Sequence, residues 1–299
     1  MKDDVKQLIR YIVNNDLSRA RTQAKCLLLN DNTSKDERFV DYMLKELDRT
    51  KDMASLLELP SNIKGLVIVE DTKETFIESR HYFREEEKKL VNRICNIRKA
   101  NEQLRERKIR VLNSTLFYGE SGTGKTTLAR YIAYKLDLPF VYLNFSNIVD
   151  SYLGSTQKNI GKIFEFIGDK DCVLMLDELD AVALRRGTQD VGEMSRVVIS
   201  LLQEFDRLNN NLVLLAATNR KDMLDEALMR RFIIKEEIKR PKSLEERLKY
   251  LTTFLDDVNM NYNIDNLRKA CMKDKTQAEL MNDLMLSMIN TLANNIGDW

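Results

Sequence analysis

The sequence from residue 115 to residue 126 is TLFYGESGTGKT. An amphipathic run follows at helical spacing, with apolar positions at Leu128, Tyr131, Ile132 and Leu136. A Gly-x-x-x-x-Gly-Lys-Thr sequence between a strand and a helix is typical of a phosphate-binding loop. Glycines let backbone N–H groups wrap around phosphates, and the helix N-terminus adds the positive end of its dipole. The pattern therefore predicts a nucleotide-binding loop over residues 119–127.

Two side chains of this loop have predicted tasks of their own. Lys125 is expected to reach the β- and γ-phosphates, and the hydroxyl of Thr126 to ligate Mg²⁺. A glycine-rich turn can match such a pattern by chance, but here the strand, the spacing and the helix all agree. We therefore predict ATP and Mg²⁺ as ligands. The other loop residues expected at the nucleotide are Gly119, Ser121, Gly122, Thr123, Gly124 and Thr127.

Short apolar runs alternate with amphipathic helical patterns through the middle of the chain. The runs cover residues 115–118, 140–143, 172–176, 212–217 and 232–238. Such alternation predicts an α/β fold in which a parallel five-stranded sheet lies between helices. We assign this ATPase domain to residues 56–240.

Helical patterns flank that domain on both sides. Apolar residues recur at helical spacing from Val5 to Ile12 and again from Leu17 to Leu28, which predicts a helical hairpin within an N-terminal module over residues 1–55. Beyond Pro241 the pattern is purely helical and predicts a small lid over residues 241–299.

Two carboxylates follow the apolar run at residues 172–176. The carboxyl ends of parallel strands form the ligand-binding edge of an α/β sheet. We predict that Asp177 holds the Mg²⁺ shell and that Glu178 orients and deprotonates the attacking water. The alternative is a pair of surface acids at a strand end, which the separation from the upstream loop disfavours.

Polar residues after the later strands complete the candidate catalytic set. Asn219 follows the run at residues 212–217 and can hydrogen-bond the water or the γ-phosphate, although an isolated turn asparagine would look the same. Arg230 and Arg231 stand just before the last run. They are either a solvated basic pair or a source of an arginine finger for a neighbouring subunit's nucleotide.

The motif order GESGTGKT, LMLDE, AATNR and LDEALMRRF resembles the AAA clade of the AAA+ ATPases. The resemblance extends from about residue 59 to the C-terminus, and it implies ATP hydrolysis in hexameric rings. It matches Asn219 to the family's first sensor residue and Arg231 to its arginine finger. Many members carry a second arginine at the position of Ile234, and Arg230 is expected to replace that arginine here. Gln277 and Ala278 match the second-sensor region and are expected to flank the nucleotide.

The segment Tyr152-Leu153-Gly154 is similar to the aromatic-aliphatic-glycine loop with which such rings grip polypeptide in a central pore. An aromatic ring beside an aliphatic side chain can hold almost any extended chain through apolar contact, and a glycine lets the loop swing. The alternative is that Tyr152 is an ordinary surface aromatic. Residues 185–193 are either a second pore loop or a solvated turn.

These patterns predict a homo-hexameric ATPase motor that unfolds or remodels protein substrates by threading, with the N-terminal module recruiting a substrate or a partner enzyme. Two alternatives are action on nucleic acid and a slow regulatory switch. The 48 basic and 47 acidic residues give a formal net charge of +1, which disfavours a polyanionic partner. The single histidine, His81, rules out a His-Glu-x-x-His protease motif in this sequence.

The remaining composition bears on location. The four cysteines are far apart and form no Cys-x-x-Cys pair, which favours a reducing compartment. The first ten residues are MKDDVKQLIR, unlike the basic start of a signal peptide, and no uninterrupted apolar stretch could cross a bilayer. We expect a cytoplasmic protein that does not enter the membrane.

Overall fold

The computed structural model describes residues 3–13, 17–30, 38–44, 47, 56, 59–61, 63–150, 153–168, 170–181, 191–208 and 212–293. The chain divides into two compact units, Met1–Ser61 and Asn62–Trp299. The first unit is helical, and the second contains the sheet. The domain boundaries at residues 55 and 240 remain predictions.

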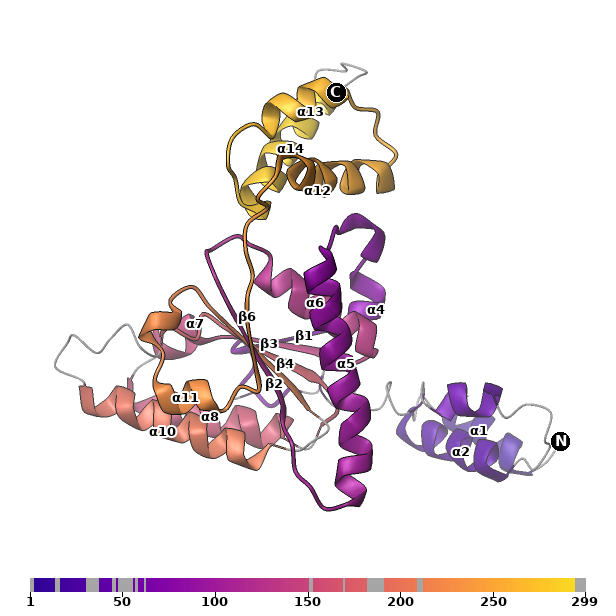
Figure 1. The fold of residues 1–299 in the computed structure, drawn as a ribbon. Helices are drawn as coiled ribbons and strands as arrows, with labels where there is room; N and C mark the ends of the chain where they lie inside the picture. Colours follow the sequence, from indigo (N-terminus) through magenta and orange to yellow (C-terminus); the bar gives the residue numbers. More distant parts are fainter. Residues whose placement is uncertain are drawn as a thin grey trace. The chain divides into compact units, whose positions relative to one another are not determined.

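The first unit contains the predicted helical hairpin. Its helices α1 (Asp3–Val13) and α2 (Leu17–Asn30) pack against each other (Figure 1). Asp3 and Asp4 lie in the first turn of α1 and Arg10 in its last, where each charge interacts favourably with the helix dipole. Residues 38–44 are also helical.

A six-stranded sheet forms the centre of the second unit, with strand order β1-β3-β4-β5-β2-β6. The five predicted strands are present and run parallel to one another. The sixth strand, β1, pairs antiparallel with β3 at one edge, so the sheet is mixed. The strands are β1 (Val67–Glu70), β2 (Asn113–Tyr118), β3 (Phe140–Asn144), β4 (Val173–Asp177), β5 (Val213–Thr218) and β6 (Ile234–Glu237).

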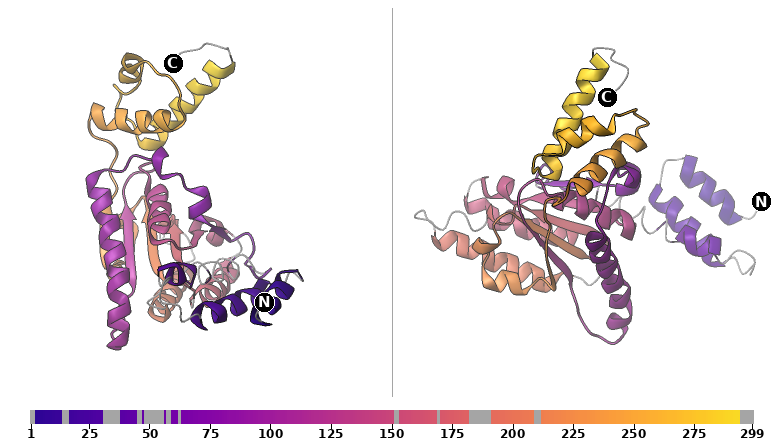
Figure 2. Two further views of the ribbon diagram at one scale, coloured as in Figure 1. Left: turned by 90° about the vertical axis from the view of Figure 1, so that its right-hand side faces the viewer. Right: turned by 45° about the horizontal axis from the view of Figure 1, so that its top comes forward.

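Helices cover both faces of the sheet. Helices α5 and α6 lie on one face, and α8 and α10 on the other (Figures 1 and 2). The helices of this unit are α4 (Thr72–Thr75), η1 (Glu78–Arg80), α5 (Glu85–Glu106), α6 (Lys125–Leu136), α7 (Phe145–Asp150), α8 (Leu153–Ile167), α10 (Val191–Arg207), η3 (Lys221–Met223), α11 (Glu226–Arg230), α12 (Leu244–Asp257), α13 (Ile264–Ala270) and α14 (Gln277–Ala293).

The central strands are buried on both faces, which explains why their sequences are continuous apolar runs rather than alternating ones. Phe117, Met175 and Leu215 belong to the core that α5 and α6 complete. Leu116 and Leu174, whose side chains point to the opposite face, have no exposed surface either. The strand ends that carry polar residues are therefore fixed by a rigid core.

Helices α12, α13 and α14 form a small lid with a core of its own. That core includes Leu251, Leu255, Leu267 and Leu284. Ser243 begins α12 by accepting a hydrogen bond from the backbone N–H of Glu246, a regular N-cap. The observed elements after residue 241 are helical, as predicted.

A buried polar network joins the lid to the sheet domain. Arg84, at the start of α5, donates to Glu87 (2.6 Å) and to the backbone carbonyl of Lys239 (3.0 Å). Nε2 of Gln277 donates to the same carbonyl (3.3 Å) and to the hydroxyl of Tyr250 (3.2 Å). The segment leading from β6 to α12 is therefore held from both sides.

Among the described residues, none of the helices combines the length and the apolar character that crossing a membrane requires. All four cysteines are free thiols.

Candidate active site

Three neighbouring strands bring the predicted catalytic residues to one edge of the sheet. Strand β5 lies between β4 and β2, and all three run parallel. Asp177 ends β4, Asn219 follows β5, and the glycine-rich loop follows β2. Residues that are far apart in the sequence are therefore neighbours at the carboxyl ends of these strands.

The glycine-rich loop needs glycine at two positions for a steric reason. Gly119 has a φ of +141°, and a Cβ there would lie 2.4 Å from the carbonyl oxygen of Ile238. Gly122 has a φ of +76°, and its Cβ would lie 3.0 Å from side-chain atoms of Thr276 and Ala278. The loop thus packs closely against the end of β6 and against the start of α14.

The lid is hydrogen-bonded directly to this loop. The backbone N–H of Ala278 donates to the carbonyl of Gly122 at 3.0 Å. Because Ala278 is the second residue of α14, the lid helix begins at the loop that would surround the phosphates. Gln277 and Ala278, predicted to flank the nucleotide, both line the cavity described below.

Lys125 begins α6, and its ammonium group donates to three uncharged oxygens. They are the carbonyls of Gly119 (2.9 Å) and Glu120 (2.8 Å) and Oδ1 of Asn219 (2.8 Å). Burial lowers the pKa of Lys125, although nearby carboxylates, first that of Asp177, act in the opposite direction. A desolvated cation with neutral hydrogen-bond partners favours an incoming anion such as a phosphate.

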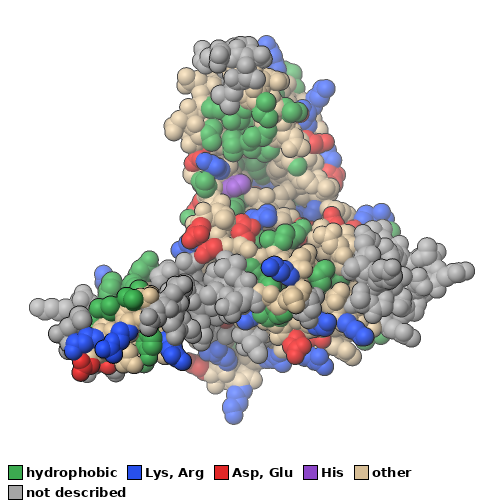
Figure 3. Space-filling view, turned by 180° about the vertical axis from the view of Figure 1, so that it is seen from behind, with side chains coloured by type: hydrophobic (Ala, Val, Ile, Leu, Met, Phe, Trp, Pro, Cys, Tyr) green, Lys and Arg blue, Asp and Glu red, His purple; other side chains and the backbone are tan. Residues whose placement is uncertain are grey.

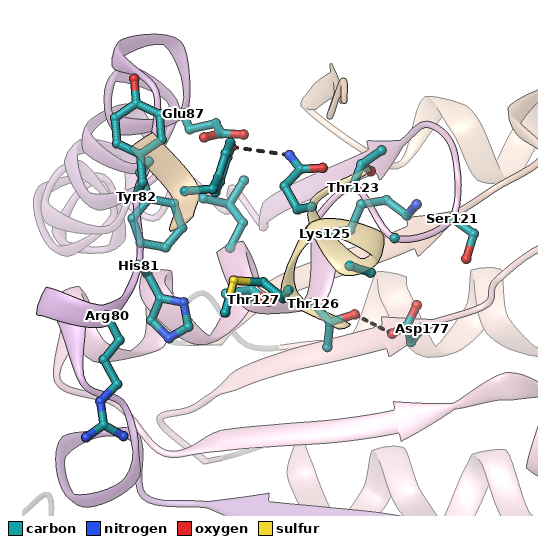
Figure 4. A pocket seen from close by; sticks show the side chains of 18 of the residues that line it. Arg80, His81, Tyr82, Glu87, Ser121, Thr123, Lys125, Thr126, Thr127 and Asp177 are labelled. Atoms are coloured by element: carbon teal, nitrogen blue, oxygen red, sulfur yellow. Dashed lines mark hydrogen bonds between the residues drawn. The ribbon is translucent and has the colours of Figure 1, made fainter. Parts of the chain in front are cut away.

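The residues predicted to hold Mg²⁺ lie together. Oγ1 of Thr126 donates to Oδ2 of Asp177 at 2.7 Å (Figure 4). Hydroxyl and carboxylate oxygens are the hard donors that Mg²⁺ prefers, usually beside waters and substrate phosphates rather than in a full protein cage. The donor set of Thr126 and Asp177 therefore fits a Mg²⁺ ion bound with a nucleotide.

Glu178 has an unusual backbone conformation. Its φ is +54°, in the left-handed region, which costs a non-glycine residue about 1–3 kcal/mol. Backbone hydrogen bonds from Leu179 to Ala217 and from Ala181 to Glu178 hold the turn. Such strain recurs at functional sites, and here it turns the chain sharply between β4 and the following residues so that Glu178 lines the cavity.

All these residues share one cavity of about 480 Å³, a volume within the range of small-molecule sites. Lys125, Asp177, Glu178 and Asn219 line it, together with residues 121–128 of the loop and of α6. Figure 4 shows Asp177 on one side of the loop and the segment from Arg80 to Tyr82 on the other.

The far end of the cavity is more apolar. Tyr82 and Tyr250 meet there edge to face, with ring centroids 5.1 Å apart, and Phe254 and Met281 of the lid line the same end. Burial, together with the positive charge of Arg80, lowers the pKa of His81, so this imidazole is neutral near pH 7. An apolar end opposite a phosphate-binding loop suits the base of a nucleotide.

Two polar residues of the site were missed by the sequence analysis. Asp180 is buried and accepts hydrogen bonds from the hydroxyl of Thr218 (2.8 Å) and the backbone N–H of Asn219 (3.2 Å). Tyr142 on β3 donates to Oδ2 of Asp177 at 3.3 Å. Asp180 lies two residues after the predicted Asp-Glu pair, a short-range signal that could have drawn attention to it.

Replacing Asp180 by alanine is expected to lower the free energy of unfolding by about 1–3 kcal/mol, because the buried hydroxyl of Thr218 and the partly buried N–H of Asn219 lose their acceptor. Urea denaturation measures the change. Asp222→Ala removes an exposed carboxylate near the same turn, and we expect this variant to be as stable as wild type. Equal stabilities for the two variants would show that Asp180 does not hold the turn before Asn219.

The two arginines lie outside the cavity of their own chain. Arg231 forms a bidentate ion pair with Asp206, both N–O distances being 2.9 Å. Arg230 pairs with Glu226 one turn earlier in α11. Neither residue lines the cavity. If either acts on a nucleotide, that nucleotide belongs to another chain.

The candidate pore loop is only partly described. Tyr152 lies outside the described residues, as do residues 185–190 of the candidate second loop, whose last three residues belong to α10. Leu153 and Gly154 are the first two residues of α8, so they are helical rather than part of a loop. A hinge at Gly154, as predicted, would therefore lie at the start of α8.

A glycine-rich loop between a parallel strand and a helix, beside two acids on a strand of the same sheet, defines the class of P-loop nucleoside triphosphatases. The model of the ATPase family associated with various cellular activities (AAA) matches residues 115–240. Residues 115–240 of the chain therefore carry the ATPase domain of this family.

Known relatives are similar to part of the chain. The peroxisomal ATPase PEX6 of Eremothecium gossypii is 34% identical in a 196-residue alignment that covers 61% of this chain and 19% of that protein. The uncharacterized AAA family ATPase y4kL of Sinorhizobium fredii is 40% identical over 144 residues, which are 48% of this chain and 43% of that protein. The chain therefore spans about a fifth of the first relative and less than half of the second.

Proposed function

We propose that this protein is a Mg²⁺-dependent ATPase motor that works as a homo-hexamer and unfolds or remodels protein substrates by threading. The observation that carries the ATPase part is the convergence of Lys125, Asp177 and Glu178 on one cavity. Lys125 begins α6, and the two acids stand at the end of β4. Phosphate binding and hydrolysis use all three groups together.

The hydrolytic roles follow from the contacts in the cavity. On ATP binding, Lys125 exchanges its carbonyl partners for the β- and γ-phosphates, and the exchange frees Oδ1 of Asn219 to bind the attacking water. Glu178 accepts a proton from that water as it attacks the γ-phosphorus in line. Thr126 and Asp177 would hold a Mg²⁺ ion, which would supply positive charge against the charge that builds up on the phosphate oxygens.

Arg231 supports assembly into a ring. It cannot serve its own cavity, yet it is 40% exposed and held by an acid that is itself more than half exposed. An ion pair of that exposure stabilises by about 0–1 kcal/mol, so the γ-phosphate of an adjacent subunit can displace Asp206. In the proposed ring, Arg231 completes the active site of the neighbouring subunit.

The proposal of a protein substrate rests on Tyr152-Leu153-Gly154 and on the relatives. Among those relatives are peroxisomal ATPases of several yeasts. The helical unit Met1–Ser61 is the part proposed to recruit a substrate or a partner enzyme. The proposed compartment is the cytosol, in accord with four free thiols.

Changing Tyr152 to alanine tests the threading proposal. We expect the ATPase rate to stay within about twofold of wild type, because Tyr152 is not proposed to touch the nucleotide, while unfolding of a tagged fluorescent protein falls at least about tenfold through lost apolar contact. Tyr152→Phe keeps the ring and should retain unfolding. Unfolding at the wild-type rate by Tyr152→Ala would contradict the proposed grip.

A regulatory switch with a slow ATPase cycle is the second candidate, and the Arg231–Asp206 pair favours it, since the finger is held within its own chain.

Action on nucleic acid is less favoured, because acidic and basic side chains are interspersed over the face in Figure 3. Stimulation of the ATPase by an unfolded protein, by DNA or by neither separates motor, nucleic-acid enzyme and switch.

A further inference from the structure

Asp177 is held by three donors from three different parts of the fold. Its Oδ2 accepts from Thr126 on α6 (2.7 Å) and from Tyr142 on β3 (3.3 Å), and its Oδ1 accepts from the backbone N–H of Glu178 (2.9 Å). Thr126 and Glu178 belong to the motifs of the active site. Tyr142 does not, and its contact with Asp177 has no role in the proposed mechanism so far.

The position of Tyr142 follows from the sheet. In the parallel pairing of β3 with β4, Tyr142 is opposite Met175 and Asn144 is opposite Asp177. Residues two apart on a strand point to the same face, so Tyr142, Asn144 and Asp177 lie on one face. Tyr142 is half-buried there and does not line the nucleotide cavity. Any effect of its hydroxyl on the nucleotide must therefore pass through Asp177.

The direction of the Tyr142 hydrogen bond follows from its partner. An ionised carboxylate has no proton to donate, so the Tyr142 hydroxyl is the donor and Oδ2 of Asp177 the acceptor. The neighbouring Asn144 uses its Oδ1 to accept from the backbone N–H of Ser146 at 2.8 Å. The phenolic proton is therefore directed to Asp177.

We propose that Tyr142 is a positioning residue that holds Asp177 in the orientation Mg²⁺ requires and thereby sets how strongly Mg²⁺ tightens ATP binding. This inference rests on the proposed Mg²⁺-dependent ATPase. Without the phenol, Oδ2 retains only the donor from Thr126, and the carboxylate is held less firmly about its side-chain torsions. When Mg²⁺ binds, the carboxylate of Asp177 must then be ordered again. This lowers the free energy that Mg²⁺ contributes to ATP binding.

The test compares nucleotide affinity with and without the metal. Titration calorimetry with a non-hydrolysable imido analogue of ATP gives the dissociation constant in MgCl₂ and in EDTA, and their ratio is the Mg²⁺ effect. For Tyr142→Phe we expect this ratio to fall about 3- to 10-fold, the range for a single hydrogen bond of ordinary strength, with an EDTA affinity equal to wild type. Hydrolysis is not needed for the measurement.

A matched control is available on α6. Tyr131 donates to the carboxylate of Glu78 at 3.0 Å, away from Asp177, so Tyr131→Phe deletes a similar hydroxyl and should leave the Mg²⁺ effect unchanged. A second variant, Asp177→Ala, completes a double-mutant cycle. In the Asp177→Ala background, adding Tyr142→Phe should change nothing, because the group through which Tyr142 acts is gone.

The outcomes distinguish this inference from the proposed function. An unchanged Mg²⁺ effect in Tyr142→Phe, or an equal loss of affinity in MgCl₂ and EDTA, would overturn the role of Tyr142 while leaving the ATPase proposal intact. If the wild type bound the nucleotide equally well in both buffers, the Mg²⁺-dependent function itself would fail. A Tyr142→Phe effect that persisted without Asp177 would also overturn the inference.

Discussion

Glu178→Gln is expected to slow ATP hydrolysis by about 10²- to 10⁴-fold, the usual contribution of a general base. Glutamine keeps the size and the hydrogen-bonding capacity of the side chain but cannot accept a proton from the attacking water. ATP affinity should stay within about threefold of wild type, because Lys125 and the glycine-rich loop are proposed to hold the phosphates. A coupled phosphate-release assay and a nucleotide-binding titration measure the two quantities.

The control for this variant is Glu237→Gln, at the end of β6. Glu237 is exposed and pairs with Lys239, and it lies outside the cavity, so hydrolysis should proceed at the wild-type rate. A Glu178→Gln protein that hydrolysed ATP within about tenfold of wild type would show that another group takes the proton.

Arg231→Ala is expected to reduce hydrolysis by about 10³- to 10⁵-fold, the range for losing an arginine finger. ATP binding should persist, since each cavity keeps its own lysine and acids. The loss arises at the neighbouring active site, where the charge that develops on the γ-phosphate in the transition state is no longer neutralised.

Mixing the two inactive variants gives a sharper test of action between subunits. An Arg231→Ala subunit has an intact cavity, and a Glu178→Gln subunit has an intact finger. Where a Glu178→Gln subunit supplies its Arg231 to the cavity of an Arg231→Ala subunit, one competent site forms. The mixture should therefore recover measurable hydrolysis. Arg268→Ala on the lid removes an exposed arginine paired with Asp265 and should behave as wild type. A mixture that stayed inactive would contradict the finger proposal.

The sheet and the phosphate-binding loop were predictable because both leave local signals. The central strands are buried on both faces, and a short, continuous apolar run such as residues 212–217 is typical of a strand in that position. The loop needs glycine at Gly119 and Gly122 for steric reasons, so its sequence is constrained wherever the fold occurs. Strand order then brings Asp177 and Asn219 to the loop.

Other features depend on contacts that one stretch of sequence cannot reveal. Strand β1 is one such feature, because its antiparallel pairing with β3 follows from how the chain returns to the sheet edge. Tyr142 is an ordinary strand aromatic until β4 places Asp177 beside it. The helical start at Leu153 was also missed, because the glycine that follows it disfavours a helix by propensity.

The hydrogen bond from Ala278 to Gly122 attaches the first turn of α14 to the loop that is proposed to hold the phosphates. The helix can therefore act as a lever arm. The helix has 17 residues and a rise of about 1.5 Å each, so it is about 25 Å long. A tilt of about 10° at the glycine-rich loop displaces its far end by about 4 Å. A small movement of the loop after loss of one phosphate would therefore give a larger displacement at the far end of α14. A protein bound at the outer end of the lid would be displaced with it.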